Sequence, residues 1–292
     1  MLHAWQARAE ERYRTRLREA LRGRRVLITG ASSGIGRAFA LDAAAAGGDL
    51  VLVARRREEL ERVAGECRRR GGRAEVRPAD LADIGAVREL TEALGREERA
   101  VEVLVSNAGV SLRRPLASHR PEDLERLAAV NYLGPAALTL GLLPAMLARG
   151  AGHVVHVSTI GTQTGAPLFA AYVAAKAACD HFLRTLRLEL GERGIAVTAV
   201  HMPLVRTPMM APSRIYELFP ALTAERAARR IGWAVVKRPL RVAPRWATAL
   251  ELGHVLAPRL VQRAFAWGHE PLHGWFGRRL ARRDRLRAGR DR

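Results

Sequence analysis

Two side chains four residues apart offer acid–base chemistry: Tyr172 and Lys176, in the run Tyr-Val-Ala-Ala-Lys. Residues i and i+4 of a helix share one face, so the phenol and the ammonium would lie close together. A free tyrosine, with a pKa of about 10, exchanges protons poorly at neutral pH. Because a neighbouring ammonium stabilises the phenolate and lowers that pKa, the spacing predicts a tyrosine tuned for proton transfer.

A second chemical signal is the turn Thr-Gly-Ala-Ser-Ser-Gly-Ile-Gly at residues 29–36. Glycines let the backbone turn tightly and approach a pyrophosphate, and the helix after them offers free N–H groups and a positive dipole end. Between a strand and a helix, such a turn indicates a dinucleotide site. The residues that we expect to hold the dinucleotide here are Gly30, Ser32, Ser33, Gly34, Ile35 and Gly36.

Arginines follow the second expected strand, which ends in Ala-Arg-Arg-Arg at residues 54–57 with no acidic residue before Glu58. An Asp or Glu near this point would bind the ribose 2′-hydroxyl of NAD, whereas arginine suits the 2′-phosphate of NADP. Arg55, with Arg37 just after the glycine turn as a second candidate, therefore predicts NADP(H). The alternative is that the three arginines merely open a solvated helix.

The elements that must position these groups are visible as short β-branched runs beginning near residues 26, 50, 74, 101, 153 and 195, which alternate with helical stretches. This alternation predicts an α/β fold, a doubly wound parallel sheet of the Rossmann type with helices on both faces. We expect an amphipathic basic helix over residues 1–24, one catalytic domain over 25–243, and an arginine-rich helical extension over 244–292.

Composition excludes several other classes of protein. With 48% apolar and 27% charged residues the chain is neither disordered nor collagen-like. Cys67 and Cys179 lack the number and spacing of a disulfide scaffold or a zinc site, and they indicate reduced thiols in a cytoplasmic protein. The net charge of +20 is concentrated at the ends, with +5 over residues 1–25 and +6 over 278–292, so we expect no nucleic-acid partner.

Three hydrophobic segments raise the question of a membrane. Residues 127–148 run without a charge, but the prolines and the asparagine inside them favour a buried or interface helix over a membrane span. The N-terminal segment is charged from Arg8 onward and contains no apolar stretch of the kind found in a secretory signal, so we expect no such signal. Both chain ends carry apolar residues at helical spacing among arginines: Leu2, Trp5, Ala9, Tyr13, Leu17 and Leu21, then Leu272, Trp275, Phe276 and Leu280. These helices would pack on the domain or a partner subunit, or contact an anionic membrane.

Together, the glycine turn and the Tyr-x-x-x-Lys pair resemble those of the short-chain dehydrogenase/reductase family. Further similar motifs follow in the family's order over residues 24–210: Asp80-Leu81, Asn107-Ala108-Gly109, Asn131, and the segment Pro203, Leu204, Val205, Arg206 and Thr207. The resemblance implies that Asp80 and Leu81 contact adenine and that Pro203, Val205 and Thr207 border the nicotinamide. It also implies a homodimer or homotetramer.

The same resemblance implies a division of labour among the catalytic residues. Tyr172 would donate a proton to a carbonyl oxygen while hydride arrives from the nicotinamide, Lys176 would hold the ribose hydroxyls, and Asn131 would position a proton-relay water. A serine would polarise the substrate oxygen, but Ser158 and Thr159 compete for that position. The family's spacing, 13 residues before the tyrosine, falls on Thr159. Adjacent strand residues face opposite sides, so only one of the two hydroxyls should reach the substrate, and we favour Thr159.

Substrate and competing functions follow less directly. Leu204 replaces the glycine usual after the proline, and only a short run at residues 240–243 stands for the family's seventh strand. The apolar segment 208–219 suits a hydrophobic substrate, unless it serves core or dimer contacts. Residues 158–164 and 201–209 are similar to bacterial fatty acyl-CoA reductase domains. We therefore predict an NADPH-dependent reductase of a hydrophobic carbonyl; the alternatives are a fatty acyl-CoA reductase giving a long-chain aldehyde and a non-catalytic NADP-binding sensor or scaffold.

Overall fold

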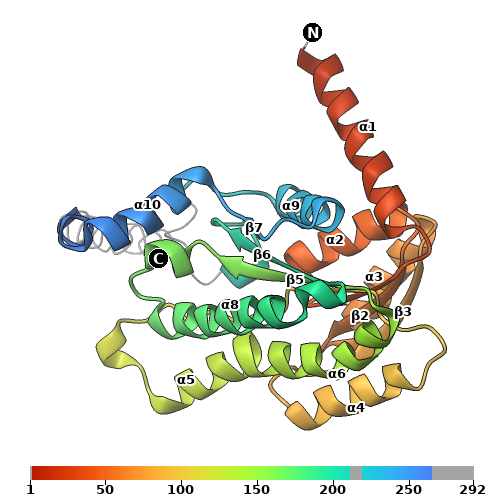
Figure 1. Cartoon of the computed structure of the whole chain (residues 1–292), viewed down its shortest axis with the longest axis horizontal. Coiled ribbons are helices and arrows are strands. Elements are labelled where there is room, and N and C mark those ends of the chain that lie inside the picture. The colour runs from red at the N-terminus through yellow and green to blue at the C-terminus, as the bar shows by residue number, and fades with distance from the viewer. Residues whose placement is uncertain (1, 211–218, 265–292) are drawn as a thin grey trace, which may run out of the picture.

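The computed structural model describes residues 2–210 and 219–264. Over these residues the molecule contains a seven-stranded parallel sheet in the order β3-β2-β1-β4-β5-β6-β7. Figure 1 shows the sheet at the centre, between layers of helices. Its strands are β1 (Arg25–Thr29), β2 (Asp49–Ala54), β3 (Arg73–Pro78), β4 (Val103–Ser106), β5 (Gly152–Thr159), β6 (Ile195–Met202) and the short β7 (Arg241–Val242). The predicted doubly wound parallel sheet is confirmed, and its strand order reverses between β1 and β4.

Helices cover both faces of the sheet. One face carries α2 (Gly34–Ala45), α3 (Arg57–Arg69) and α9 (Ala224–Lys237), and the other carries α4 (Ile84–Gly95), α6 (Gly134–Arg149) and α8 (Ala170–Leu190). The remaining α-helices are α1 (Leu2–Leu21), α5 (Pro121–Ala128), α7 (Gly161–Thr164) and α10 (Arg245–Leu256). Short 3-10 turns and one π-helical turn, η2 (Ala129–Leu133), complete the described elements.

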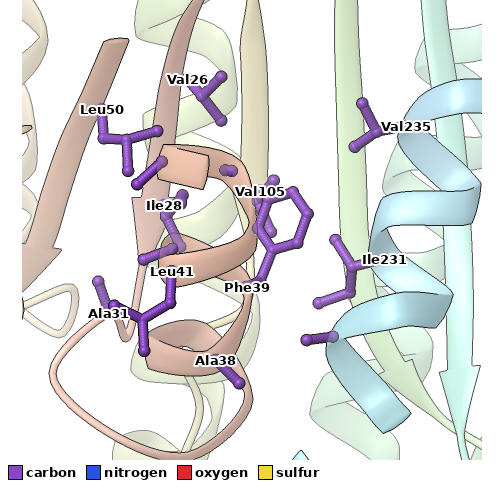
Figure 2. Packing of buried hydrophobic residues seen from close by; sticks show 14 of the residues in the cluster. Val26, Ile28, Ala31, Ala38, Phe39, Leu41, Leu50, Val105, Ile231 and Val235 are labelled. Carbon is purple, nitrogen blue, oxygen red and sulfur yellow. The ribbon is translucent and has the colours of Figure 1, made fainter. Parts of the chain in front are cut away.

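Alternation along each strand divides the core into two layers. In β1, Val26 and Ile28 belong to the layer under α2 and α9, whereas Leu27 belongs to the layer over α4, α6 and α8. Successive strand residues point to opposite faces, so a buried parallel strand contributes to both layers. Figure 2 shows the first layer, in which Phe39 of α2 faces Ile231 of α9. This two-layer core fixes the carboxyl ends of the strands at which the site is built.

The predicted N-terminal helix is present as α1, and its second half packs on the domain. Leu17 and Leu21 are buried in the layer shared with α2 and α9. The Tyr13 hydroxyl donates to Asp42 Oδ2 of α2 at 3.3 Å, and Glu10 pairs with an arginine of α9. The first half of α1 extends away from the domain (Figure 1). The helix predicted around Leu272, Trp275, Phe276 and Leu280 lies outside the described residues.

The uncharged stretch at 127–148 lies within the continuous helical run Pro121–Arg149. Among the described residues, this is the one helix whose length and composition would allow it to cross a membrane, and 56% of its most apolar window is buried inside the domain. Leu138 and Met146 are fully buried in the layer beneath the sheet. The segment therefore serves as a core helix in this fold, as its interrupting prolines and asparagine indicate.

Candidate active site

A cavity of about 620 Å³ opens at the carboxyl ends of the strands, at the point where the strand order reverses. This crevice is where doubly wound sheets bind their ligands. Its walls hold most of the residues selected from the sequence: Gly30, Ser32, Ser33, Gly34, Ile35, Arg55, Asp80, Leu81, Asn107, Ala108, Gly109, Ser158, Thr159, Tyr172, Lys176, Pro203, Val205 and Thr207. Three selected residues, Gly36, Arg37 and Asn131, do not line it.

The glycine turn is held by the end of β4. Gly30 has a φ of +65°, which glycine adopts without strain. A Cβ added to Gly36 would lie 2.3 Å from the carbonyl oxygen of Gly30. The Asn107 side chain donates to the Thr29 carbonyl at 2.9 Å, and the Thr29 hydroxyl accepts from the N–H of Ala108 at 2.9 Å. Gly36 thus allows the close approach of the Gly30 carbonyl, and Asn107 holds the start of the turn by its hydrogen bond to Thr29.

The first turn of α2 suits a phosphate. The side chain of its N-cap residue, Ser33, makes no capping hydrogen bond. The free N–H groups and the dipole of this twelve-residue helix therefore remain available to an anion. Across the cavity, Thr207 approaches the turn so closely that a Cβ on Gly34 would lie 3.2 Å from its methyl group. Side chains at these glycine positions would fill the space at the turn. Glycine therefore leaves room for the phosphates of a dinucleotide to approach the backbone closely.

The arginines predicted to bind the cofactor lie at the end of β2 and in the first turn of α2. Among the described residues, the cations that line the cavity are Arg55, Arg56 and Lys176. The Arg55 guanidinium lies 3.8 Å from the Asp80 carboxylate and is 62% exposed, so it is free to pair with a further anion. Arg37 does not line the cavity, and its guanidinium pairs with Glu66 of α3 at 2.6 Å, so its contact with the cofactor stays a prediction. Arg56 was not singled out, although the run of three arginines contained that signal.

Tyr172 and Lys176 both face the cavity from α8. The Tyr172 hydroxyl is hydrogen-bonded to the Thr159 side chain, and burial raises the pKa of the phenol to about 12. The Lys176 ammonium, 3% exposed, donates to the carbonyl of Val157 at 2.9 Å, and burial lowers its pKa. The sequence predicted a lowered pKa for Tyr172. The structure shows the opposite direction because removal from water outweighs the favourable groups nearby.

Asn131 lies in the π-helical turn η2 and is fully buried behind the cavity wall. Its amide nitrogen donates to the carbonyls of Val110 and Leu127, both at 2.9 Å, and its oxygen accepts from the Val110 N–H at 3.2 Å. A Cβ on Gly109 would lie 2.9 Å from the Asn131 oxygen and 3.5 Å from Lys176 Nζ. Asn131 therefore fixes the loop after β4 beside Lys176, and the water-positioning role stays a prediction.

Ser158 and Thr159 at the end of β5 have different hydrogen-bond partners. The Ser158 hydroxyl, 3% exposed, donates to Asp180 Oδ2 of α8 at 2.7 Å. The Thr159 hydroxyl accepts from the Gly161 N–H at 3.2 Å and is hydrogen-bonded to Tyr172. Both hydroxyls thus contact α8, Thr159 at Tyr172 and Ser158 at Asp180, eight residues further along the helix. Their partners distinguish them, since the phenol lines the cavity and Asp180 does not.

Apolar side chains close the cavity near Tyr172. Leu204, Met209, Met210 and Phe169 are among its lining residues. The backbone of Leu204 accepts from Leu222 at 2.9 Å, which joins the segment after β6 to the strand-like return before α9. Residues 211–218, which include most of the predicted substrate lid, lie outside the described residues. The described part of this wall is suited to a hydrophobic ligand.

A doubly wound parallel sheet with a glycine turn at its reversal point is typical of dinucleotide-binding proteins, and the Tyr172–Lys176 pair lines the same cavity as that turn, an arrangement that suits an oxidoreductase. Residues 24–217 match the family model described as short chain dehydrogenase. The chain belongs to the short-chain dehydrogenase/reductase family.

Relatives of known name share most of the chain. A fatty acyl-CoA reductase of Acinetobacter baylyi is 43% identical over 243 residues, which cover 82% of each protein. A fatty acyl-CoA reductase of Mycobacterium tuberculosis is 41% identical over 256 residues, covering 87% of each. Among solved structures, a short-chain dehydrogenase from Sphingobium yanoikuyae in complex with NADPH matches with a TM-score of 0.73 and 28% identity, over 82% of this chain and 95% of that one.

Proposed function

We propose that this protein is an NADPH-dependent reductase of long-chain acyl thioesters, with Tyr172 as the proton donor. The observation that carries the proposal is the hydrogen-bonded pair of Tyr172 and Thr159, which meets Lys176 and the glycine turn in one cavity. Two relatives at 41–43% identity are named fatty acyl-CoA reductases, which supports an acyl substrate. The apolar wall around Leu204 and Met209 supports a hydrophobic one.

The preference for NADPH over NADH rests on charge at the end of β2. Arg55 and Arg56 line the cavity, and Asp80 is the neighbouring carboxylate, 3.8 Å from Arg55. Two guanidinium groups beside a single carboxylate favour the additional phosphate of NADPH. A structural neighbour bound to NADPH is consistent with this choice.

When bound, reduced nicotinamide supplies a hydride to the carbonyl carbon. Thr159 has one hydroxyl hydrogen, which faces the Tyr172 phenol, and the Gly161 N–H occupies one of its acceptor positions. A substrate oxygen bound between the two hydroxyls would replace the phenol as the acceptor of that hydrogen. Tyr172 gives its proton to the same oxygen as negative charge develops there. Lys176, held by the Val157 carbonyl, stabilises the phenolate that remains and binds the ribose hydroxyls.

For a thioester the atoms balance as follows. Hydride adds to the carbonyl carbon and the proton of Tyr172 to its oxygen, which gives a hemithioacetal. The carbon–sulfur bond then breaks, the thiol leaves with one proton, and an aldehyde is the product. One NADPH is consumed for each thiol released, so both quantities report the reaction.

The competing interpretation is a non-catalytic NADP-binding sensor or scaffold. A panel of acyl-CoAs, aldehydes and ketones of increasing chain length separates the two. Our proposal predicts NADPH oxidation that increases with acyl chain length and releases one free thiol per NADPH. NADPH binding without turnover of any member of the panel would favour the sensor, and turnover of short ketones alone would overturn the acyl assignment.

A further inference from the structure

The helix that carries Tyr172 and Lys176 carries a third ionisable group at the same interval. Asp180 follows Lys176 by four residues on α8, so the phenol, the ammonium and the carboxyl group share one helical face. The Asp180 side chain is only 11% exposed, and its Oδ2 accepts the hydrogen bond from Ser158 at 2.7 Å. Tyr172 and Lys176 line the cavity, whereas Asp180 lies behind its wall.

The groups that face Asp180 come from four elements. His156 Nε2 of β5 lies 3.9 Å from its Oδ1, and His201 Nδ1 of β6 lies 3.9 Å from its Oδ2. The Thr162 hydroxyl of α7 donates to the Thr159 carbonyl at 2.9 Å and lies 3.1 Å from His201 Nδ1, and Lys176 of α8 acts on the carboxyl group through its charge. The outer charges near His201 are Arg241 and Glu251, which bond to each other at 2.6 Å.

Of these neighbours, Lys176 is the cation. Burial lowers the pKa of His156 well below its usual value, and burial also lowers the pKa of His201, so both imidazoles are neutral at pH 7. Burial raises the pKa of the Cys179 thiol to about 12, so that thiol is neutral as well. A buried ammonium is costly unless a charge of opposite sign accompanies it, and Asp180 is the carboxyl group four residues along the same helix. Burial raises the pKa of Asp180, whereas the hydrogen bond from Ser158 and the charge of Lys176 lower it.

We propose that Asp180 is a positioning residue whose ionised carboxylate keeps Lys176 cationic and Tyr172 protonated, and so extends reductase activity to higher pH. The inference rests on the proposed function for its link to activity. Its negative charge favours the protonated forms of both groups: burial lowers the pKa of Lys176 while Asp180 raises it, and Asp180 also raises the pKa of Tyr172. Removal of the charge must therefore shift both titrations, and the alkaline limit of reduction, to lower pH.

The chain permits a direct measurement because its only two lysines are Lys176 and Lys237. Protein labelled with 13C at lysine Cε gives two NMR signals, which Lys237→Arg assigns. In Asp180→Asn, which keeps the shape of the side chain, the Lys176 titration should move down by at least about one pH unit. The exposed Lys237 serves as an internal reference and should not move. An unchanged Lys176 titration would overturn the inference, since it would show that Asp180 is uncharged or too weakly coupled.

Two further variants separate charge from structure. Glu189→Gln removes a carboxylate from the exposed end of the same helix and should leave both lysine titrations in place. Asp180→Glu restores the charge and should return the Lys176 titration toward that of the wild type. If Asp180→Asn does not fold, the 13C shift of the Asp180 carboxyl group in the wild type decides: a carboxylate at pH 7 supports the inference, and a protonated acid refutes it.

The pH–rate profile then connects the charge to catalysis. The alkaline limb of NADPH oxidation in Asp180→Asn should move to lower pH in parallel with Lys176, while Glu189→Gln keeps the wild-type limb. A shifted lysine titration with an unshifted limb would refute the link to activity. The lysine measurement needs no turnover, so an inactive wild-type protein would contradict the proposed function without affecting the test of Asp180.

Discussion

Replacing Thr159 by valine tests which hydroxyl at the end of β5 takes part in catalysis. The substitution keeps the branched shape of the side chain and removes the group that contacts both Tyr172 and the Gly161 N–H. A donor aimed at a developing oxyanion contributes about 10²–10³ in turnover, or about 2.7–4 kcal/mol of barrier. We expect kcat for NADPH-dependent reduction to fall by that factor, with little change in the binding of NADPH. Thr159→Ser should remain active.

Ser158→Ala is the matched comparison because it removes the adjacent hydroxyl. The single hydrogen of Ser158 is already donated to Asp180 at 2.7 Å, so none is left for a substrate. Its loss removes a donor from a buried carboxyl group and should cost about 1–3 kcal/mol in the free energy of unfolding. Turnover should fall less than tenfold. Steady-state kinetics and urea unfolding of both variants therefore give opposite rankings, and a larger kinetic loss in Ser158→Ala than in Thr159→Val would refute the assignment.

Three further predictions concern the cofactor and the N-terminal helix. NADPH should bind at least about tenfold more tightly than NADH, a difference of about 1.4 kcal/mol in binding free energy. Fluorescence titration should show this preference lost in Arg55→Asp and kept in Arg57→Asp, and equal affinity of the wild type for the two cofactors would contradict the prediction. Gly36→Ala should weaken NADPH binding at least tenfold in the same assay, because its Cβ would lie 2.3 Å from the Gly30 carbonyl, whereas Gly95→Ala, with nothing within 4 Å, should not. If α1 contacts membranes, the protein should sediment with anionic vesicles at low salt but not with neutral vesicles. Deletion of residues 1–8 should abolish that sedimentation, because it leaves the packed second half of the helix in place. Sedimentation of the deletion variant would place the membrane contact elsewhere.

Features that depend on local sequence and periodicity could be predicted. Buried parallel strands produce short β-branched runs, and the backbone conformation of the phosphate-binding turn requires glycine. Both features can therefore be predicted from the sequence alone. The choice of Thr159 over Ser158 follows from its spacing to Tyr172, which places it at the phenol. In each case the controlling physics acts within a few residues of the chain.

Features that depend on contacts between residues far apart in the sequence could not be predicted. Arg37 pairs with Glu66, which belongs to a different helix, and no local pattern indicates that contact. The sign of the pKa shift of Tyr172 is decided by how deeply the folded chain buries the phenol. The neighbours of Asp180 likewise come from β5, β6 and α7, and the topology alone brings them together.

The single-turnover rate of NADPH oxidation with a long-chain acyl-CoA, compared between the wild type and Tyr172→Phe, tests the central claim most directly. Phenylalanine keeps the ring and removes the proton that the mechanism needs. Tyr172→Phe should bind NADPH as the wild type does and oxidise it about 10²–10⁴-fold more slowly. A variant that oxidises NADPH at the wild-type rate, or a wild type that binds NADPH and releases no thiol from the acyl-CoA, would contradict the claim.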